Sequence, residues 1–272
     1  MIAAISLLLG TTIGLFLGLF GGGGATLAVP VFVYVLHYGA SEAIAMSLVV
    51  VGVTSLIGSV RAWRAGDVRP RSTLLLGSVA MIGAYAGARA AAFVSDGVQL
   101  ALFAVVLLSS GALLLRARPE PGESNDAPEP PTDGAQLHPA WWLIVITGAT
   151  VGVMTGLAGV GGGFLVVPAL LLLGLPLSAA VGTSLVVIAM NSAAGLVGYL
   201  HEVQVPWTLV GEITAAAVVG FFGGDRIASS IPERTLRRAF AAFLLVVGAF
   251  VLLQNGIVLA AVDHAAATLA IR

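Results

Sequence analysis

Long apolar runs separated by short polar breaks cover almost the whole chain. Runs of about 18 or more apolar residues are typical of membrane-spanning helices. The breaks divide the first half into expected helices at 2–20, 25–37, 42–63, 72–93 and 98–116. They divide the second half into expected helices at 141–157, 163–174, 178–200, 207–228 and 235–254. The pattern predicts an all-α polytopic membrane protein with about eight to ten spans.

Composition supports this class. Hydrophobic residues make up 58% of the chain and charged residues only 9%, whereas a soluble domain carries roughly 25% charged residues. We therefore expect a multi-pass protein of the inner (plasma) membrane with the lipid bilayer around it. The net charge of −1 gives no reason to expect nucleic acid as a partner. The absence of cysteine excludes disulfides, thiol chemistry and cysteine-bound metals.

One segment breaks the apolar pattern. Residues 117–139 contain five acidic residues and six prolines, a composition typical of a flexible aqueous linker. The linker separates a first transmembrane repeat, 1–116, from a second, 140–254. The remaining residues, 255–272, are weakly apolar and interrupted by Asp263 and His264. We interpret them as a C-terminal tail and not as a span.

The two halves are homologous. GLFLGLFGGGGATLAVP aligns without a gap on GVMTGLAGVGGGFLVVP at an offset of 138 residues. Three further matches follow at an offset of 137. In chain order, the matching pairs are 14–30 with 152–168, 47–58 with 184–195, 83–93 with 220–230, and Gly111 with Gly248. Matches in the same order at nearly one offset indicate an internal duplication.

Arginine placement predicts that the repeats are inverted. Arg61, Arg64, Arg69 and Arg71 lie between the third and fourth helices of the first half, and the equivalent loop of the second half has none. The second cluster lies one loop later, around Arg237. Because arginine-rich short loops stay cytoplasmic, five crossings per half would put both clusters on that side. The alternative is that a bias on so few arginines carries no signal.

Two short helices follow glycine clusters. A helix of 13 residues is roughly 20 Å long, shorter than a hydrocarbon core of about 30 Å. The glycines permit positive φ, and their N–H groups cannot face lipid. Two helix N-termini near the midplane would then present positive dipole ends to an anion. The alternative is that these glycines only permit tight helix packing. The clusters are Gly21, Gly22, Gly23 and Gly24, and Gly159, Gly161, Gly162 and Gly163.

Polar side chains within the spans complete the candidate substrate-binding set. Hydroxyls and an amide can donate hydrogen bonds to an anion without burying an opposing charge, although each alone also fits an interhelical hydrogen bond. Asn191 is the strongest single candidate. Near the span ends, Asp225 and Arg89 fit interface anchors better than a substrate clamp. The polar candidates are Thr26, Ser47, Thr54, Ser55, Thr183, Ser184, Asn191 and Ser192.

The paired motifs GLFGGGGATLAVP and GLAGVGGGFLVVP, with GTSLVV after the second, resemble the TauE/SafE family of sulfite-exporter-like membrane proteins. The resemblance covers the chain apart from the linker and the tail. It implies a carrier of sulfite, organosulfonates or other small anions. The first half departs from the pattern, with Ala45-Met46-Ser47 where the second half has Gly182-Thr183-Ser184.

We therefore expect a secondary transporter that exports a small anion, such as sulfite or an organosulfonate, by alternating access. The alternative is an anion channel or an accessory membrane subunit. An enzyme is not expected, because no catalytic set is present: His201-Glu202 lacks the second histidine of a zinc motif. We expect no catalytic residue, no metal and no cofactor. The apolar outer faces are compatible with a homo-oligomer.

Overall fold

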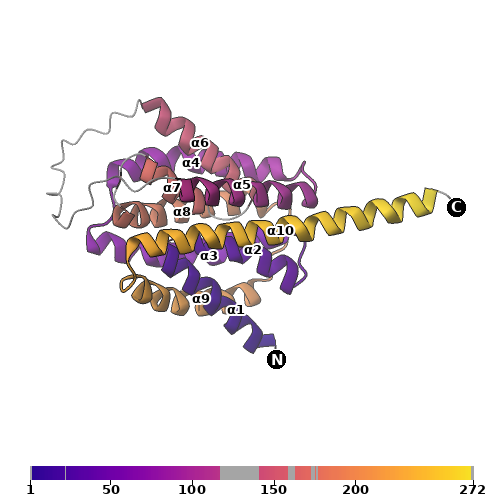
Figure 1. The fold of residues 1–272 in the computed structure, drawn as a ribbon, viewed down its shortest axis with the longest axis horizontal. Coiled ribbons are helices and arrows are strands. Elements are labelled where there is room, and N and C mark those ends of the chain that lie inside the picture. The colour runs from indigo at the N-terminus through magenta and orange to yellow at the C-terminus, as the bar shows by residue number, and fades with distance from the viewer. Residues whose placement is uncertain are drawn as a thin grey trace.

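The computed structural model describes residues 2–21, 23–116, 141–158, 163–172, 175 and 177–270, and within these residues it contains helices and no strand (Figure 1). In the first half the helices are α1 (Ile2–Phe20), η1 (Gly23–Leu27), α2 (Ala28–Pro30), η2 (Val31–Val35), α3 (Ala40–Ala65), α4 (Pro70–Ala91) and α5 (Asp96–Arg116). In the second half they are α6 (Trp141–Ala158), α7 (Gly163–Leu172), α8 (Leu177–Tyr199), α9 (Trp207–Ala228) and α10 (Glu233–Ala270).

The expected all-α membrane class is confirmed. Within the described ranges, six helices are long and apolar enough to cross a membrane: α3, α4, α5, α8, α9 and α10. Three shorter apolar helices lie at Ile5–Phe20, Gly24–Val35 and Val145–Leu157. How many of these shorter helices complete a crossing stays a prediction. The predicted linker, 117–139, lies outside the described residues.

The first short segment has a more varied geometry than the single helix expected at 25–37. After α1 the chain turns at Gly21, which has φ +57°. It then forms a 3-10 turn (η1), a short α-helical stretch (α2) and a π-helical turn (η2). Pro30 has no N–H to donate, so it interrupts the regular α-helical ladder. The equivalent segment of the second half, α7, is a 10-residue α-helix that includes Pro168.

The last helix is longer than expected. We expected it to end at residue 254, followed by a tail, but α10 continues without a break to Ala270. The sequence beyond 255 contains no proline and is rich in alanine, the residue with the highest helix propensity. The polar interruption at Asp263 and His264 therefore does not end the helix.

Glycine stripes bring helices of the two halves into close contact. Gly10, Gly14 and Gly18 line the face of α1 that packs against α9, and a Cβ on Gly14 would collide with the carbonyl oxygen of Ala217. Residue numbers rise together along the contact, from Gly10 against Ile213 to Gly18 against Phe221, so α1 and α9 run parallel. Small residues at this spacing are a common packing device of membrane helices.

The second half repeats this contact. Gly148, Gly152 and Gly156 on α6 lie against Leu76, Ala80 and Ala84 on α4, and each of these residues is equivalent to its counterpart in the α1–α9 pair. The first helix of each repeat therefore packs along the fourth helix of the other. The two contacts are thus reciprocal, and equivalent residues approach one another in both.

Equivalent helices that contact each other run antiparallel. Gly52 lies against Ser192 while Gly195 lies against Leu48, so α3 and α8 have opposite directions. The helices α5 and α10 are also antiparallel, because Gly111 lies against Ala241 while Gly248 lies against Ala104. The orientation of the bundle in a membrane stays a prediction.

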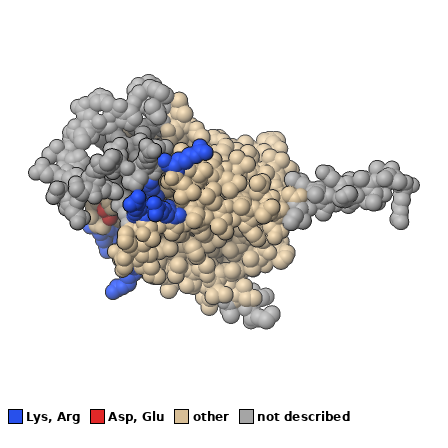
Figure 2. Space-filling view, in the orientation of Figure 1, with Lys and Arg blue, Asp and Glu red and all other residues tan. Residues whose placement is uncertain are grey.

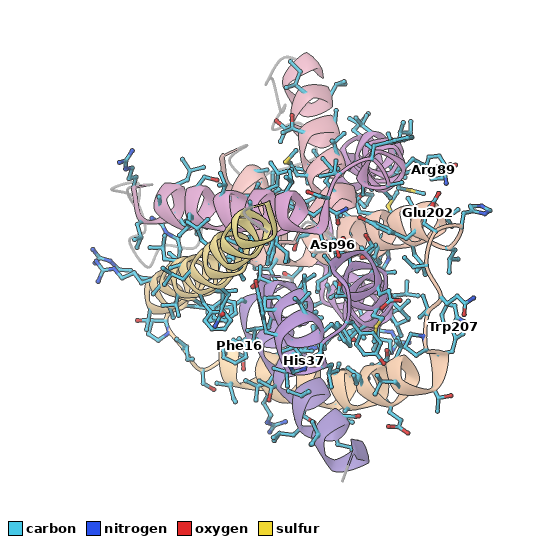
Figure 3. All side chains as sticks on the ribbon, turned by 90° about the vertical axis from the view of Figure 1, so that its right-hand side faces the viewer. Phe16, His37, Arg89, Asp96, Glu202 and Trp207 are labelled. Atoms are coloured by element: carbon cyan, nitrogen blue, oxygen red, sulfur yellow. The ribbon has the colours of Figure 1, made fainter. Side chains whose placement is uncertain are left out.

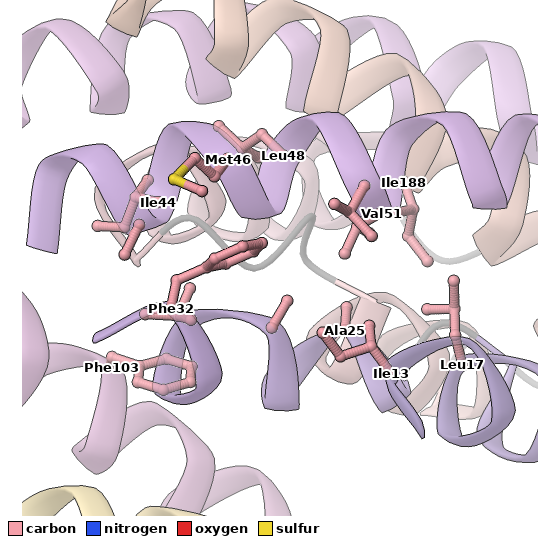
Figure 4. Close-up of a cluster of buried hydrophobic side chains, with 14 of the residues drawn as sticks. Ile13, Leu17, Ala25, Phe32, Ile44, Met46, Leu48, Val51, Phe103 and Ile188 are labelled. Atoms are coloured by element: carbon pink, nitrogen blue, oxygen red, sulfur yellow. The ribbon is translucent and has the colours of Figure 1, made fainter. Parts of the chain in front are cut away.

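The first short segment is enclosed by the bundle. Ala25, Ala28 and Phe32 are completely buried. In Figure 4, Phe32 lies between Met46 of α3 and Phe103 of α5. Backbone that leaves the regular α-helical pattern is tolerated at membrane depth only where protein or water surrounds it. The core thus keeps this segment away from lipid.

Charged side chains gather at the two ends of the bundle. The loops after α3 and after α9 meet at one end, where Asp67 and Ile231 line the same cavity. Figure 2 shows the visible arginines gathered toward this end, on the left. Figure 3 looks onto the opposite end, where an Arg89 guanidinium nitrogen lies 3.2 Å from a Glu202 carboxylate oxygen.

Candidate functional site

The candidate site lies where α3 and α8 cross near the middle of their length. Two consecutive polar residues on each helix lie near this crossing: Thr54 and Ser55 on α3, and their equivalents Asn191 and Ser192 on α8. All four are at most 1% exposed. A Cβ on Gly52 would lie 2.9 Å from the Ser192 Cβ, so a glycine is needed for this close crossing. The antiparallel crossing brings these polar residues of the two repeats to the same depth.

Three of these four side chains have polar atoms without a partner. The Asn191 Nδ2 and Oδ1 atoms and the hydroxyls of Ser55 and Ser192 find no hydrogen-bond partner among the described residues. An unpaired buried polar group costs about 1–3 kcal/mol by mutational measurement. Such groups in a native fold call for a bound ligand or water to satisfy them.

The remaining polar candidates already make hydrogen bonds within the protein. The Thr54 hydroxyl donates to the Val50 carbonyl at 2.7 Å, and the Ser47 hydroxyl donates to the Ile44 carbonyl at 2.8 Å. Thr26 is completely buried and also has an interaction partner. Thr54 and Ser47 thus bond to carbonyls of their own helix, as serine and threonine in helices often do.

Thr183 and Ser184 support backbone segments that surround the site. The Thr183 hydroxyl oxygen accepts a hydrogen bond at 3.1 Å from the N–H of Arg69, which lies in the loop between α3 and α4. The Ser184 hydroxyl lies 2.7 Å from the Val181 carbonyl oxygen and 3.2 Å from that of Gly21. Ser184 therefore ties the first glycine cluster to α8.

The first glycine cluster packs tightly against its surroundings. A Cβ on Gly21 would collide with the Val181 side chain, and a Cβ on Gly24 would collide with backbone at the end of α1. This is the packing role that the sequence left open as an alternative. Gly23 and Gly163 are the first residues of η1 and α7, which contact each other. Gly22, Gly159, Gly161 and Gly162 lie outside the described residues.

A cavity of about 360 Å³ lies at the arginine-rich end. It is formed by the C-terminal ends of α1, α3 and α9 and by the start of α8. Among its lining residues are Arg61 and Asp225, whose side chains form an ion pair between α3 and α9. The candidate residue that lines the cavity is Gly21. The cavity thus connects the charged end of the bundle with the first glycine cluster.

Two ion pairs and one buried tyrosine were not predicted from the sequence. Asp225 and Arg89, which were expected to be interface anchors, form ion pairs with Arg61 and with Glu202 respectively. Tyr199 was not considered, although its buried hydroxyl donates to the Gly156 carbonyl at 3.0 Å. Comparison of the repeats position by position could have singled out Tyr199, because alanine stands at the equivalent position.

Apolar helices long enough to span a membrane, packed around buried polar residues and with a cavity at one end, define a multi-pass helical membrane protein. The chain belongs to the sulfite exporter TauE/SafE family, whose model matches residues 6–251. The resemblance seen in the sequence is thus confirmed.

Relatives from distant organisms agree with this class. A probable membrane transporter protein of Xylella fastidiosa (strain Temecula1 / ATCC 700964) is 30% identical over 255 residues, which cover 90% of this chain and 93% of the relative. The probable membrane transporter protein YdhB of Bacillus subtilis (strain 168) is 25% identical over 231 residues, 84% of this chain and 91% of YdhB. No solved structure matches the chain significantly. The family description and the names of these relatives are those of membrane transporters.

Proposed function

We propose that this protein is a secondary transporter that exports a small anion, such as sulfite or an organosulfonate, across the cell membrane. The anion binds at the crossing of α3 and α8. The observation that carries this proposal is the set of unpartnered polar atoms of Ser55, Asn191 and Ser192, which are buried together at the centre of the bundle.

The chemistry of this centre suits an oxyanion. Two hydroxyls and one amide NH₂ group can donate hydrogen bonds to oxygen atoms of the substrate, and no acidic side chain lies among the four polar residues of the crossing. A hydrogen bond to a charged group contributes about 1.5–3 kcal/mol. Donors of this kind offset part of the desolvation of the anion without a buried arginine, which lets the anion leave again.

The glycine clusters complete the proposed site. The segments that begin at Gly23 and Gly163 contact each other, and each is the start of a short helix after a glycine cluster. Helix starts of this kind present N–H groups and a positive dipole end to an anionic substrate. In this proposal the two helix starts, one from each repeat, both bind the substrate.

The reciprocal packing of the repeats supports alternating access. The pairs α1–α9 and α6–α4 are equivalent, and an exchange of conformation between the halves would turn a cavity at one end into a cavity at the other. The cavity at the arginine-rich end leads to Gly21, whose carbonyl oxygen lies 3.2 Å from the Ser184 hydroxyl. The transport path then continues toward the crossing of α3 and α8.

The test is uptake of radiolabelled sulfite into proteoliposomes that hold the purified protein. Saturable uptake that unlabelled sulfite on the opposite side stimulates is expected, because only a carrier shows such exchange; flux without exchange would favour the channel alternative. Sulfate, sulfoacetate and other small anions serve as competitors. Absence of flux for every anion, with folded protein in the vesicles, would contradict the proposal.

The Asn191→Ala variant tests the location of the site. It is expected to raise the sulfite concentration at half-maximal uptake, because it removes one donor to the anion. The matched control is Thr155→Val, whose wild-type hydroxyl is equally buried but donates to the Val151 carbonyl at 2.7 Å. Equal half-saturation in Asn191→Ala and Thr155→Val would place the site elsewhere.

A further inference from the structure

The two ends of the bundle differ at positions that the repeats share. The cavity at the arginine-rich end is lined by Gly18 of α1 and Ala62 of α3. Their equivalents in the second repeat are Gly156 of α6 and Tyr199 of α8. A large aromatic side chain therefore stands at the far end where the cavity end has a methyl group.

Tyr199 fills the place that corresponds to the cavity. Its side chain is 2% exposed and belongs to the same buried apolar cluster as Ile44. Its hydroxyl donates to the Gly156 carbonyl oxygen at 3.0 Å, which links α8 to α6. At the other end, Gly18 and Ala62 are among the residues that line the cavity.

A second set of equivalent positions also has larger spacing between helices at the cavity end than at the other end. At the cavity, the ion pair between Arg61 and Asp225 spans α3 and α9. Gly198 and Ala88 stand at the equivalent positions, and a Cβ on Gly198 would lie only 2.6 Å from the Ala88 Cβ. Long charged side chains bridge the two helices at the open end, whereas small residues let α8 and α4 pack directly at the closed end.

We propose that Tyr199 is the gate of the transport path at the end opposite the arginine cluster. This proposal rests on the transport function proposed above. In the structure the cavity extends from the arginine-rich end to Gly21, and the Tyr199 ring occupies the equivalent position at the other end. The hydrogen bond to Gly156 holds the ring in place, and release of the substrate at the far end requires that the ring leave this position.

The assignment makes Tyr199 a positioning residue and not a binding residue. Its hydroxyl is engaged by backbone, whereas the unpartnered atoms that we assign to the anion belong to Ser55, Asn191 and Ser192. A change at Tyr199 should therefore alter which end of the path is accessible. Protection of a buried thiol from an aqueous reagent reports this directly and needs no transported substrate.

The chain has no cysteine, so single cysteines can be introduced without further change. Val181 lines the cavity, and its equivalent in the first repeat is Ile44, which is 1% exposed. Their carbonyls accept equivalent hydrogen bonds, from the Ser184 and the Ser47 hydroxyl. Val181→Cys and Ile44→Cys are thus a matched pair of probes, one on each route.

The reagent is a small sulfonated methanethiosulfonate, added to membrane vesicles of either orientation. With Tyr199 in place, Val181→Cys should react from the arginine-rich side and Ile44→Cys should be protected from both sides. Adding Tyr199→Ala should raise the reaction rate of Ile44→Cys at least about tenfold from the opposite side, the factor that corresponds to 1.4 kcal/mol of lost closure. Tyr199→Phe, which keeps the ring, should leave Ile44→Cys largely protected.

The mirror variant Ala62→Tyr places a tyrosine in the cavity and should slow the reaction of Val181→Cys. The proposal is overturned if Ile44→Cys stays protected in folded Tyr199→Ala protein that still labels normally at Val181→Cys. It is also overturned if Tyr199→Phe exposes Ile44→Cys as fully as Tyr199→Ala does. A protein without sulfite flux that shows the expected labelling would contradict the proposed substrate and leave the gate standing.

Discussion

Replacing Asn191 with leucine should separate the stability of the fold from its transport activity. Asparagine and leucine branch alike at Cγ, but leucine is larger, and Asn191 is completely buried, so Asn191→Leu removes polarity and adds volume. In the wild-type protein neither the Nδ2 nor the Oδ1 atom of Asn191 has a hydrogen-bond partner in the described part of the chain. The substitution thus removes two unpaired polar atoms from the centre of the bundle.

The expected effect on stability follows from the cost of those two atoms. Burial of an unpaired amide costs about 1–3 kcal/mol in soluble proteins. Polar contributions between membrane helices are smaller, about 0.6–2 kcal/mol, because the unfolded state in the membrane also finds partners. Loss of the amide should therefore raise the free energy of unfolding by up to about 2 kcal/mol. This gain offsets the overpacking by the larger leucine, which costs about 1–3 kcal/mol.

The expected effect on transport has the opposite sign. Leucine cannot donate to the anion, and a hydrogen bond to a charged group contributes about 1.5–3 kcal/mol. At 1.4 kcal/mol for each factor of ten, the sulfite concentration at half-maximal uptake should rise about 10- to 150-fold. Thr155→Val should leave this concentration unchanged, because the Thr155 hydroxyl is satisfied by its own helix.

Two measurements on the same preparation check this prediction: thermal unfolding in detergent and initial uptake rates in proteoliposomes. A loss of more than about 3 kcal/mol of stability in Asn191→Leu exceeds the cost of overpacking and would show that the amide makes structural hydrogen bonds. Unchanged half-saturation would show that no substrate meets Asn191. Either result would refute the reasoning that an unpaired amide marks the site.

Three further predictions concern packing, topology and a loop. Gly14→Ala should destabilise the fold by about 1–3 kcal/mol, because its Cβ collides with the α9 backbone. Gly223→Ala, where nothing lies within 4 Å, should stabilise the fold by about 0.5–1 kcal/mol. Thermal unfolding compares the two variants, and equal shifts would contradict the packing role of the glycines on α1. Single cysteines in the loops 66–69 and 229–232 should both react from the cytoplasmic side, and opposite exposure would disprove the predicted inversion. Gln99→Leu should lower stability by about 1–2 kcal/mol, because the Gln99 Nε2 donates to two carbonyls beyond α4 at 2.9 and 3.1 Å; unaltered unfolding would show that this cap contributes nothing.

The membrane class, the helix boundaries and the family could be predicted from the sequence because they depend on local properties. The length of an apolar run decides whether a helix can span the bilayer. Glycine clusters mark where α1 and α6 end, and the structure has its short segments after them. The duplicated motif was specific enough to indicate the family. The last helix was misjudged, because helix propensity beyond 255 outweighed a local drop in hydropathy.

The site was predicted only as a set of candidates, because the pairing of a hydroxyl is not a local property. Thr54 and Ser55 are neighbours of similar chemistry on one helix, yet Thr54 donates to a carbonyl of its own helix and Ser55 has no described partner. Thr183 and Ser184 turn out to hold backbone segments that are distant in sequence. Only the rotamer and the neighbouring backbone decide between these outcomes.

The sequence by itself determined that this chain is a helical membrane protein of the TauE/SafE family, since hydrophobic length and motif spacing can be read along the chain. It also predicts an internal duplication. Only the tertiary structure decided which polar atoms lack partners and that Arg61 forms an ion pair with Asp225. It also showed that Ala62 lines a cavity at one end, whereas its equivalent, Tyr199, is buried at the other end. The physical reason is that each of these facts depends on contacts between helices far apart in sequence. Neither local periodicity nor helix propensity contains information on such contacts.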